Sequence, residues 1–206
     1  MNQQSAGLGL LLLALSATNA SAHHVMGGRM PATFMDGLLS GLGHPIIGID
    51  HFAAVVAVGC LAAMHNAGPT LVIGFIAATM AGVVLHLHGA SLPAAELLGA
   101  ITVIALGALL VGNREMPTGP VLTLFALVGL VHGYALGESI YGAEPTPIYA
   151  YLTGLAVVQS AIALVAMKIA RGFAGAPVSL SPLRPVGAGI AGVGLAVLVQ
   201  QVVPTA

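Results

Sequence analysis

The chain has 206 residues, of which 58% are hydrophobic and only 5% are charged, and its mean hydropathy is +1.02. Soluble globular domains carry about 25% charged residues, so this composition excludes a water-soluble domain and indicates a surface covered by lipid. The net charge of −1 gives no reason to expect nucleic acid as a partner, and the single cysteine excludes both an internal disulfide framework and a multi-cysteine metal cluster.

The first 22 residues have the pattern of a secretory signal peptide. An apolar stretch over residues 8–15 is too short to span a membrane, and Ala20-Ser21-Ala22 forms an A-x-A cleavage pattern. The segment before it lacks Lys and Arg, which leaves an uncleaved N-terminal helix as the alternative. We expect residues 1–22 to be removed, so that residues 23–206 form a single six-helix transmembrane permease domain whose N-terminus is periplasmic.

Six later runs are long and apolar enough to cross a bilayer, because a spanning helix needs about 20 mainly apolar residues. Short connections rich in Gly, Pro and Asn separate these runs, so no soluble domain fits between them. Pro69, Pro93, Pro120 and Pro185 each stand at the start of a run, where the missing N–H costs little. The sequence therefore predicts an all-α polytopic membrane protein with six transmembrane helices. The runs cover about 45–63, 69–87, 93–111, 120–136, 148–167 and 185–203.

The distribution of positive charges predicts the orientation of these helices. With the N-terminus outside, only Arg29 lies outside, and the helix ends that hold the other cationic residues face the cytoplasm, as the positive-inside rule requires. The signal-peptide pattern gives the same orientation independently. We therefore expect a protein of the bacterial inner (plasma) membrane. The cytoplasmic cationic residues are Arg114, Lys168, Arg171 and Arg184.

Histidines and carboxylates gather toward the outer face of the predicted bundle. Ionisable side chains at membrane depth cost about 2.5–3.5 kcal/mol each, so they are functional candidates. Imidazole with a few carboxylates suits Ni(II), Co(II) or Zn(II), whereas Cu(I) favours Cys or Met and Mg(II) favours oxygen alone. Four helices contribute these side chains, and only His65 falls on the cytoplasmic side. The outer group is His44, Asp50, His51, His86, His88, Glu96, His132 and Glu138.

The first span needs a bend if its three polar residues are to meet. On a straight helix Asp50 points about 100° away from His51. Pro45 and Gly48 allow the segment to bend or unwind so that His44, Asp50 and His51 all turn inward, and discontinuous helices of this kind build transporter sites.

Other positions have alternative interpretations. His86 and His88 cannot share a face of a regular helix, so at most one is expected to be a ligand, and either can instead form a helix–helix hydrogen bond. Glu96 can simply favour a helix N-terminus through the dipole. Gly133 and Gly137 form a small-xxx-small face that predicts close helix packing.

Two segments carry a family resemblance. His44-Pro45-Ile46-Ile47-Gly48-Ile49-Asp50-His51 resembles the motif H-P-x-x-G-x-D-H of the HupE/UreJ family of nickel and cobalt permeases, and His132-Gly133-Tyr134-Ala135-Leu136-Gly137-Glu138 is similar to the family's H-G-x-A-x-G-E. The similarity covers the whole mature chain. It implies that metal recognition and passage involve His44, Asp50, His51, His132 and Glu138.

The candidate ligand His86 lies outside both motifs and depends on the topology alone. Family members work beside nickel enzymes, hydrogenase or urease, or in cobalt uptake for cobalamin, and the sequence does not choose among these settings. It is equally silent on the oligomeric state.

The resulting hypothesis is a secondary transporter or facilitator, and not an enzyme, that takes up Ni²⁺ or Co²⁺ as cargo without a tightly bound cofactor. In this hypothesis the ion loses water at His44, Asp50 and His51, and a transient site deeper in the membrane is then completed by His132 and Glu138. No Walker-type nucleotide loop is present.

Two alternatives come from other functional classes. A membrane b-type haem electron-transfer protein would use intramembrane histidines as axial ligands, but it gives no role to Asp50 beside His51. An intramembrane hydrolase lacks support, because neither H-E-x-x-H nor G-x-S-x-G occurs in the sequence.

Overall fold

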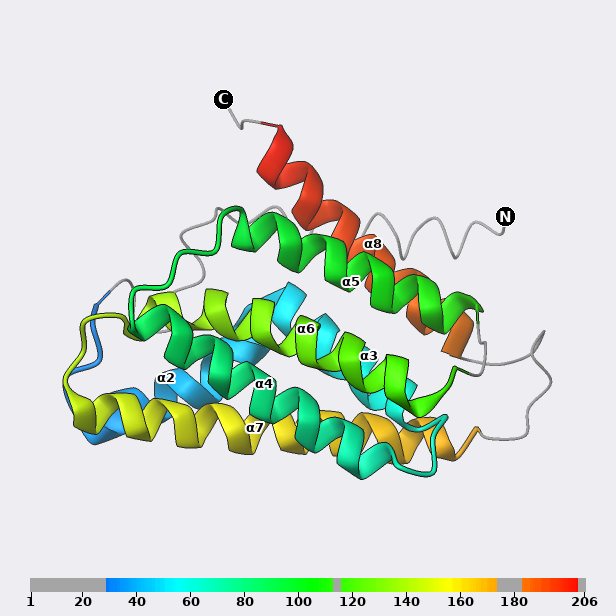
Figure 1. Ribbon diagram of the computed structural model, residues 1–206, viewed down its shortest axis with the longest axis horizontal. Helices are drawn as coiled ribbons and strands as arrows, with labels where there is room; N and C mark the ends of the chain where they lie inside the picture. The colour runs from blue at the N-terminus through cyan, green and yellow to red at the C-terminus, as the bar shows by residue number, and fades with distance from the viewer. Residues whose placement is uncertain (1–28, 113–115, 174–182, 204–206) are drawn as a thin grey trace.

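The computed structural model describes residues 29–112, 116–173 and 183–203, and every regular element in these ranges is helical. The predicted signal peptide and Arg114 lie outside the described residues. Figure 1 shows the helices as a layered bundle in which most axes run along its long dimension. The elements are α2 (Phe34–Ile47), α3 (Ile49–Ala62), α4 (Gly68–Leu87), α5 (Ala95–Gly112), α6 (Thr118–Gly137), the 3-10 helix η2 (Glu138–Ile140), α7 (Pro145–Arg171) and α8 (Leu183–Val202).

Five of these helices, α4 to α8, are long and apolar enough to cross a membrane. The pair α2 and α3 reaches the same length and hydropathy only together, and its two halves meet at an angle of 78°. Counting the bent pair as one span gives six. The prediction of an all-helical polytopic membrane protein is confirmed.

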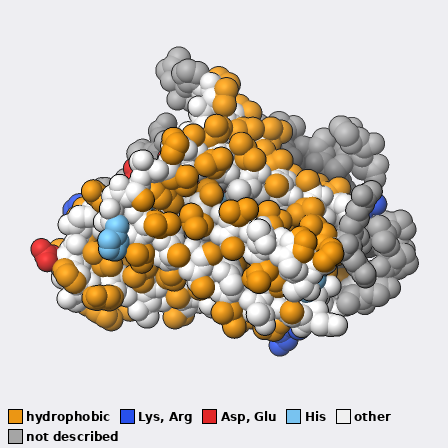
Figure 2. Space-filling model, viewed as in Figure 1, with side chains coloured by type: hydrophobic (Ala, Val, Ile, Leu, Met, Phe, Trp, Pro, Cys, Tyr) orange, Lys and Arg blue, Asp and Glu red, His pale blue; other side chains and the backbone are white. Residues whose placement is uncertain are grey.

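The surface of the bundle is too apolar to be stable in water. Large side chains such as Ile73, Leu127 and Ile169 are 67%, 59% and 59% exposed. Figure 2 shows hydrophobic side chains spread over the visible face, with charged groups only toward its edges. An apolar surface of this extent is stable only when lipid covers it, so the chain is an integral membrane protein.

The helices pack in pairs through small residues. α4 packs against α6, α5 against α8, and α7 against both α2 and α3. Gly133 lies against the backbone of Thr79, where any Cβ would collide, and a Cβ on Gly137 would lie 2.8 Å from the Cβ of His86. The packing face predicted from Gly133 and Gly137 is therefore confirmed, and it joins α6 to α4.

The first span begins earlier than predicted. We expected Pro45 at its start, but Pro45 lies inside α2, which begins at Phe34. The reason is a capping box, in which the backbone N–H of Asp36 donates to Thr33 Oγ1 (3.1 Å) and the N–H of Thr33 donates to Asp36 Oδ2 (3.0 Å). This pair satisfies backbone donors that a helix start otherwise leaves unpaired.

The break that the sequence allows between Pro45 and Asp50 is present, and it falls at Gly48. This residue has φ −71° and ψ 100°, which is extended, so α2 stops there and α3 begins at the next residue. A Cβ at position 48 would lie 2.7 Å from Cδ2 of His51. Glycine is required because the imidazole of His51 lies directly against the backbone at the break.

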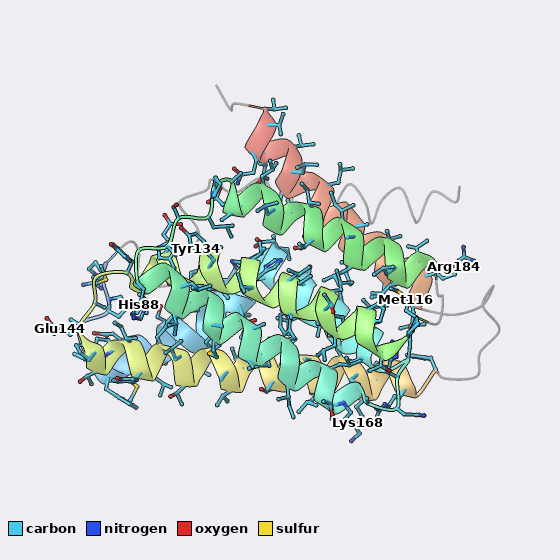
Figure 3. All side chains as sticks on the ribbon, in the orientation of Figure 1. His88, Met116, Tyr134, Glu144, Lys168 and Arg184 are labelled. Carbon is cyan, nitrogen blue, oxygen red and sulfur yellow. The ribbon has the colours of Figure 1, made fainter. Side chains whose placement is uncertain are left out.

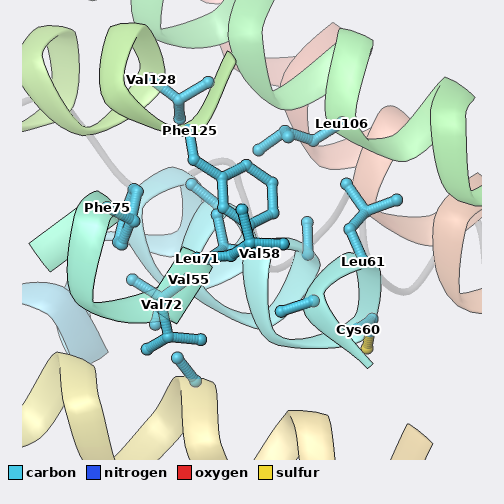
Figure 4. Close-up of a cluster of buried hydrophobic side chains, with 14 of the residues drawn as sticks. Val55, Val58, Cys60, Leu61, Leu71, Val72, Phe75, Leu106, Phe125 and Val128 are labelled. Atoms are coloured by element: carbon cyan, nitrogen blue, oxygen red, sulfur yellow. The ribbon is translucent and has the colours of Figure 1, made fainter. Parts of the chain in front are cut away.

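The core contains two apolar clusters with a polar layer between them. Figure 4 shows the larger cluster, in which Phe75, Phe125 and Leu106 pack among valines and leucines of several helices. The smaller cluster includes Tyr151 and Leu136. Three helices each place one buried polar residue between the two clusters, one turn from an apolar residue on either side. These triplets are Phe75–Thr79–Val83, Val128–His132–Leu136 and Leu155–Gln159–Ala163.

Candidate metal site

Three predicted site residues meet at the break in the first span. Asp50, His51 and His132 each offer a ligand atom, and these atoms all lie within 4.8 Å of one another. His51 Nδ1 is 2.9 Å from His132 Nδ1 and 3.9 Å from Asp50 Oδ2. Both histidines are buried, at 6% and 2% exposure. Residues 81 positions apart in the sequence therefore form one compact group with two nitrogens and a carboxylate.

Two residues of the group belong to the start of one helix. Asp50 and His51 lie in the first turn of α3, immediately after Gly48. The carboxylate of Asp50 lies near the positive end of the helix dipole, which stabilises its charge. Successive residues of a helix point about 100° apart, yet the two side chains turn so that Asp50 Oδ2 lies 3.9 Å from His51 Nδ1.

His44 lies beside this group and is held by hydroxyl groups. Its ring stands edge-on to the ring of His51, with centroids 5.9 Å apart, and its Nδ1 is 3.1 Å from Ser139 Oγ. Tyr151 Oη donates to the carbonyl of Leu136 at 2.8 Å, and Ser139 Oγ donates to the same carbonyl at 3.0 Å. Both hydroxyls therefore have an acceptor other than His44, and they hold its ring beside the group.

Thr102 of α5 determines which nitrogen of His132 is available. The Thr102 hydroxyl donates its single hydrogen to the carbonyl of Gly99 at 2.7 Å, and its oxygen is 3.0 Å from His132 Nε2. The oxygen must therefore accept from Nε2–H. The lone pair of the neutral ring then lies on Nδ1, which faces His51. Metal-bound histidines commonly have their other nitrogen held in this way.

Two further histidines lie outside this group: His86, which was predicted as a ligand, and its neighbour His88. His86 packs edge-on against Tyr134 and Tyr141, with ring centroids 4.5 and 5.4 Å apart, and its buried Nδ1 has no hydrogen-bond partner among the described residues. His88 is exposed, and its Nδ1 contacts the carbonyl of Val84 in its own helix at 2.8 Å. Ligation by His86 stays a prediction.

The carboxylates Glu138 and Glu96 also lie apart from the group. Glu138 is exposed and begins η2 directly after α6 ends. We expected it to complete a site deeper in the membrane than Asp50, and this role stays a prediction; its side chain is exposed, whereas that of Asp50 is partly buried. Glu96 is in the first turn of α5 and accepts a hydrogen bond from Gln201.

Two polar residues near the group, Thr102 and Tyr151, and the buried Gln159 of α7 were not predicted as functional. Threonine in a spanning helix commonly bonds to its own backbone, as Thr102 does to Gly99. Its sequence context therefore shows nothing unusual. Gln159 offered a signal, since it is a lone amide inside the long apolar run of α7.

The group lies nearer one end of the bundle. Figure 3 labels His88 and Glu144 toward one end and Lys168 and Arg184 toward the other. His132 is five residues from the end of α6, or about 7.5 Å at 1.5 Å per residue, on the His88 side. The site thus lies close to the end of the bundle that has few cationic residues, which we call its shallow side.

Comparison with known proteins is consistent with the two motifs. Residues 11–197 match the model of the HupE / UreJ protein family. The chain therefore belongs to the HupE/UreJ family. This is a family of membrane transport proteins associated with nickel, rather than a family of enzymes. The resemblance inferred from His44–His51 and His132–Glu138 is confirmed.

A curated relative is similar over part of the HupE/UreJ chain. Protein HupE of Rhizobium leguminosarum bv. viciae is 35% identical over 104 residues, which is 50% of this chain. The matched region spans about half of that relative, 54% of its length. No solved structure matches the chain.

Proposed function

We propose that this chain is a permease that admits divalent nickel or cobalt across the bacterial inner membrane, with the ion as cargo. The observation that carries the proposal is the Asp50–His51–His132 group, which is buried at a helix break inside an apolar bundle. Two imidazoles and one carboxylate form a donor set that suits borderline divalent metals. Membership of the HupE/UreJ family supports the same cargo.

The two imidazole nitrogens already face one another without an ion. Nδ1 of His51 and Nδ1 of His132 are 2.9 Å apart, which is the length of an N–H···N hydrogen bond. The donor types, two nitrogens and a carboxylate, favour Ni(II), Co(II) or Zn(II) over Cu(I) or Mg(II).

In the proposed mechanism the ion enters from the shallow side and loses water as it reaches the break. Glu138, exposed near the entrance, attracts the cation before it reaches the buried group. Asp50 offsets part of its charge, and the lone pair of His132 Nδ1 binds it. The ion then takes the place of the hydrogen between His51 and His132, and His51 binds it as its other neutral tautomer, with that proton on Nε2. Only three protein donors hold it, which keeps binding weak enough for release, as conduction requires.

The orientation follows from the charges. Lys168 and Arg184 lie at the end of the bundle away from the site, and Arg171 contacts the carbonyl of His65. Cationic loops stay in the cytoplasm. We therefore propose that the shallow side of the site faces the periplasm and that passage is inward.

The haem alternative fits this geometry poorly. Axial histidines of a b-type haem approach the iron from opposite faces of the porphyrin, so the ring lies between them. His51 and His132 are in direct hydrogen-bond contact, and Asp50 is the third member of their group. The arrangement favours a small cation.

The test is accumulation of ⁶³Ni²⁺ in cells that express the chain, with Co²⁺ as competitor. Asp50→Asn keeps the shape of the side chain and removes its charge, so we expect accumulation to fall to the background of cells without the chain while the protein stays in the membrane. Glu144→Gln is the matched control, because Glu144 is an exposed carboxylate without a side-chain capping bond. Background accumulation by the wild type, or normal accumulation by Asp50→Asn, would overturn the proposal.

A further inference from the structure

Gln159 of α7 is the most unusual buried residue outside the candidate metal site. Its side chain is 1% exposed, and neither the carboxamide oxygen nor the nitrogen has a hydrogen-bond partner among the described residues. Buried amides are almost always hydrogen-bonded, because leaving their donors and acceptors unpaired is costly. An exception of this kind points to a ligand that completes the pairing.

Gln159 lies in the same polar layer as the metal site. One turn before it, Leu155 belongs to the smaller apolar cluster, and one turn after it, Ala163 belongs to the larger one. His132 occupies the equivalent position on α6. The amide is therefore at the boundary that the ion must reach before it crosses the larger apolar cluster.

The packing of α7 also places Gln159 beside the broken span. Gly41 of α2 lies against the backbone of Tyr151 and Leu155, and Gly59 of α3 lies against the backbone at Ala163. Gln159 lies between these two contacts along α7. The stretch of chain that lies between Gly41 and Gly59 contains the break and the motif His44–His51.

We propose that the carboxamide of Gln159 forms a second station of the ion path, in the same layer as the Asp50–His51–His132 group, where it binds the partly hydrated divalent cation after it leaves that group. The oxygen accepts a hydrogen bond from water on the ion or replaces that water as a ligand, and the NH₂ group donates to a second water. This inference rests on the proposed transport function and extends it by one site.

An uncharged amide suits this position. A second carboxylate one step further along the path would hold a divalent ion too tightly for onward movement, whereas an apolar residue would offer nothing to an ion that has left the metal site. Amide oxygens are weak, hard donors, so the ion exchanges them for water readily.

The test replaces Gln159 with methionine, which keeps the length of the side chain and removes the amide. Transport is measured as the initial rate of ⁶³Ni²⁺ uptake into proteoliposomes, and binding as the affinity of the purified protein for Ni²⁺. We expect the uptake rate to fall about tenfold or more, with binding at the metal site changed by less than about threefold. Thr153→Val is the control, because Thr153 is an exposed polar residue of the same helix whose hydroxyl bonds to the carbonyl of Tyr149.

Thermal stability separates this role from a structural one. If the fold leaves the amide unpaired, Gln159→Met removes an unfavourable group, and the melting temperature stays the same or rises while transport falls. A fall in melting temperature would show that the amide has partners within the fold and would overturn the inference. An unchanged uptake rate would also overturn it. Failure of the wild type itself to take up Ni²⁺ would instead reject the proposed function.

Discussion

The contact between Thr102 and His132 yields the sharpest prediction about the metal site. Thr102→Val keeps the shape of the side chain and removes the oxygen that accepts from His132 Nε2–H. In the wild type this bond keeps the lone pair on Nδ1, toward His51. Without it, the ion-free ring can move its proton to Nδ1 and donate to His51 instead. The ion-bound ring cannot do so, because the ion needs the lone pair of Nδ1.

The size of the effect follows from that difference. In the variant, metal binding leaves Nε2–H buried and unpaired, and such a donor costs about 1–3 kcal/mol. At 1.4 kcal/mol per tenfold change, the affinity for Ni²⁺ should fall by about 5- to 150-fold. Loss of a group that orients a metal-bound histidine typically lowers metal affinity by about 10- to 100-fold, which lies within this range. His132 is 2% exposed, so water has little access to replace the lost partner.

The assay combines uptake with a spectroscopic readout. Thr102→Val should raise the Ni²⁺ concentration for half-maximal uptake by the factor above, and Thr102→Ser, which retains the hydroxyl, should restore it. Nitrogen-15 NMR of labelled histidine should show His132 protonated at Nε2 in the wild type and the serine variant, and at Nδ1 in part of the valine variant. Wild-type affinity in Thr102→Val, or failure of serine to restore it, would refute the reasoning.

Two further predictions test the packing and the limits of the site. Gly133→Val should destabilise the bundle by about 1–3 kcal/mol or more, because any Cβ at this position collides with the backbone of Thr79; the melting temperature in detergent checks this, and Gly189→Val, at a position with open space, should leave it unchanged. His88→Ala should leave ⁶³Ni²⁺ uptake within about twofold of the wild type, because the exposed ring contacts only its own helix carbonyl at Val84 in the described structure. A large loss of uptake in that variant would show that the path begins further out than the structure indicates.

Much of the fold could be predicted because membrane-spanning helices appear in the sequence as long apolar runs. Five apolar runs became α4 to α8 with ends close to those expected. The first span was harder, since its start depends on the capping box of Thr33 and Asp36 rather than on hydropathy. Pro45 does not begin a helix, because the capping box starts α2 at Phe34 and Pro45 lies inside that helix.

The site could be predicted in part, for a physical reason that differs between residues. Imidazoles and carboxylates are rare at membrane depth, so Asp50, His51 and His132 stand out in the sequence and do meet in the structure. Whether a side chain reaches the group depends on helix rotation, which hydropathy does not determine. His86 therefore faces Tyr134 instead.

The polar layer explains how the bundle accommodates such a site. Its buried polar groups lie where the two apolar clusters meet, so they interrupt neither cluster. Most of them are also paired internally: Thr79 donates to the carbonyl of Phe75, and His132 contacts both His51 and Thr102. These bonds offset the cost of burying polar groups in the bundle.

Gln159 differs from the other members of the layer because its amide lacks such a partner in the described structure. A residue that served only the fold would gain stability by becoming apolar, as Leu155 and Ala163 on either side already are. Retention of an unpaired amide beside a helix break that carries metal donors is therefore best explained by a ligand that occupies the layer only during transport. That explanation requires the Ni²⁺ uptake rate of Gln159→Met to fall while its melting temperature stays the same or rises. A purely structural role for the amide would not produce this combination.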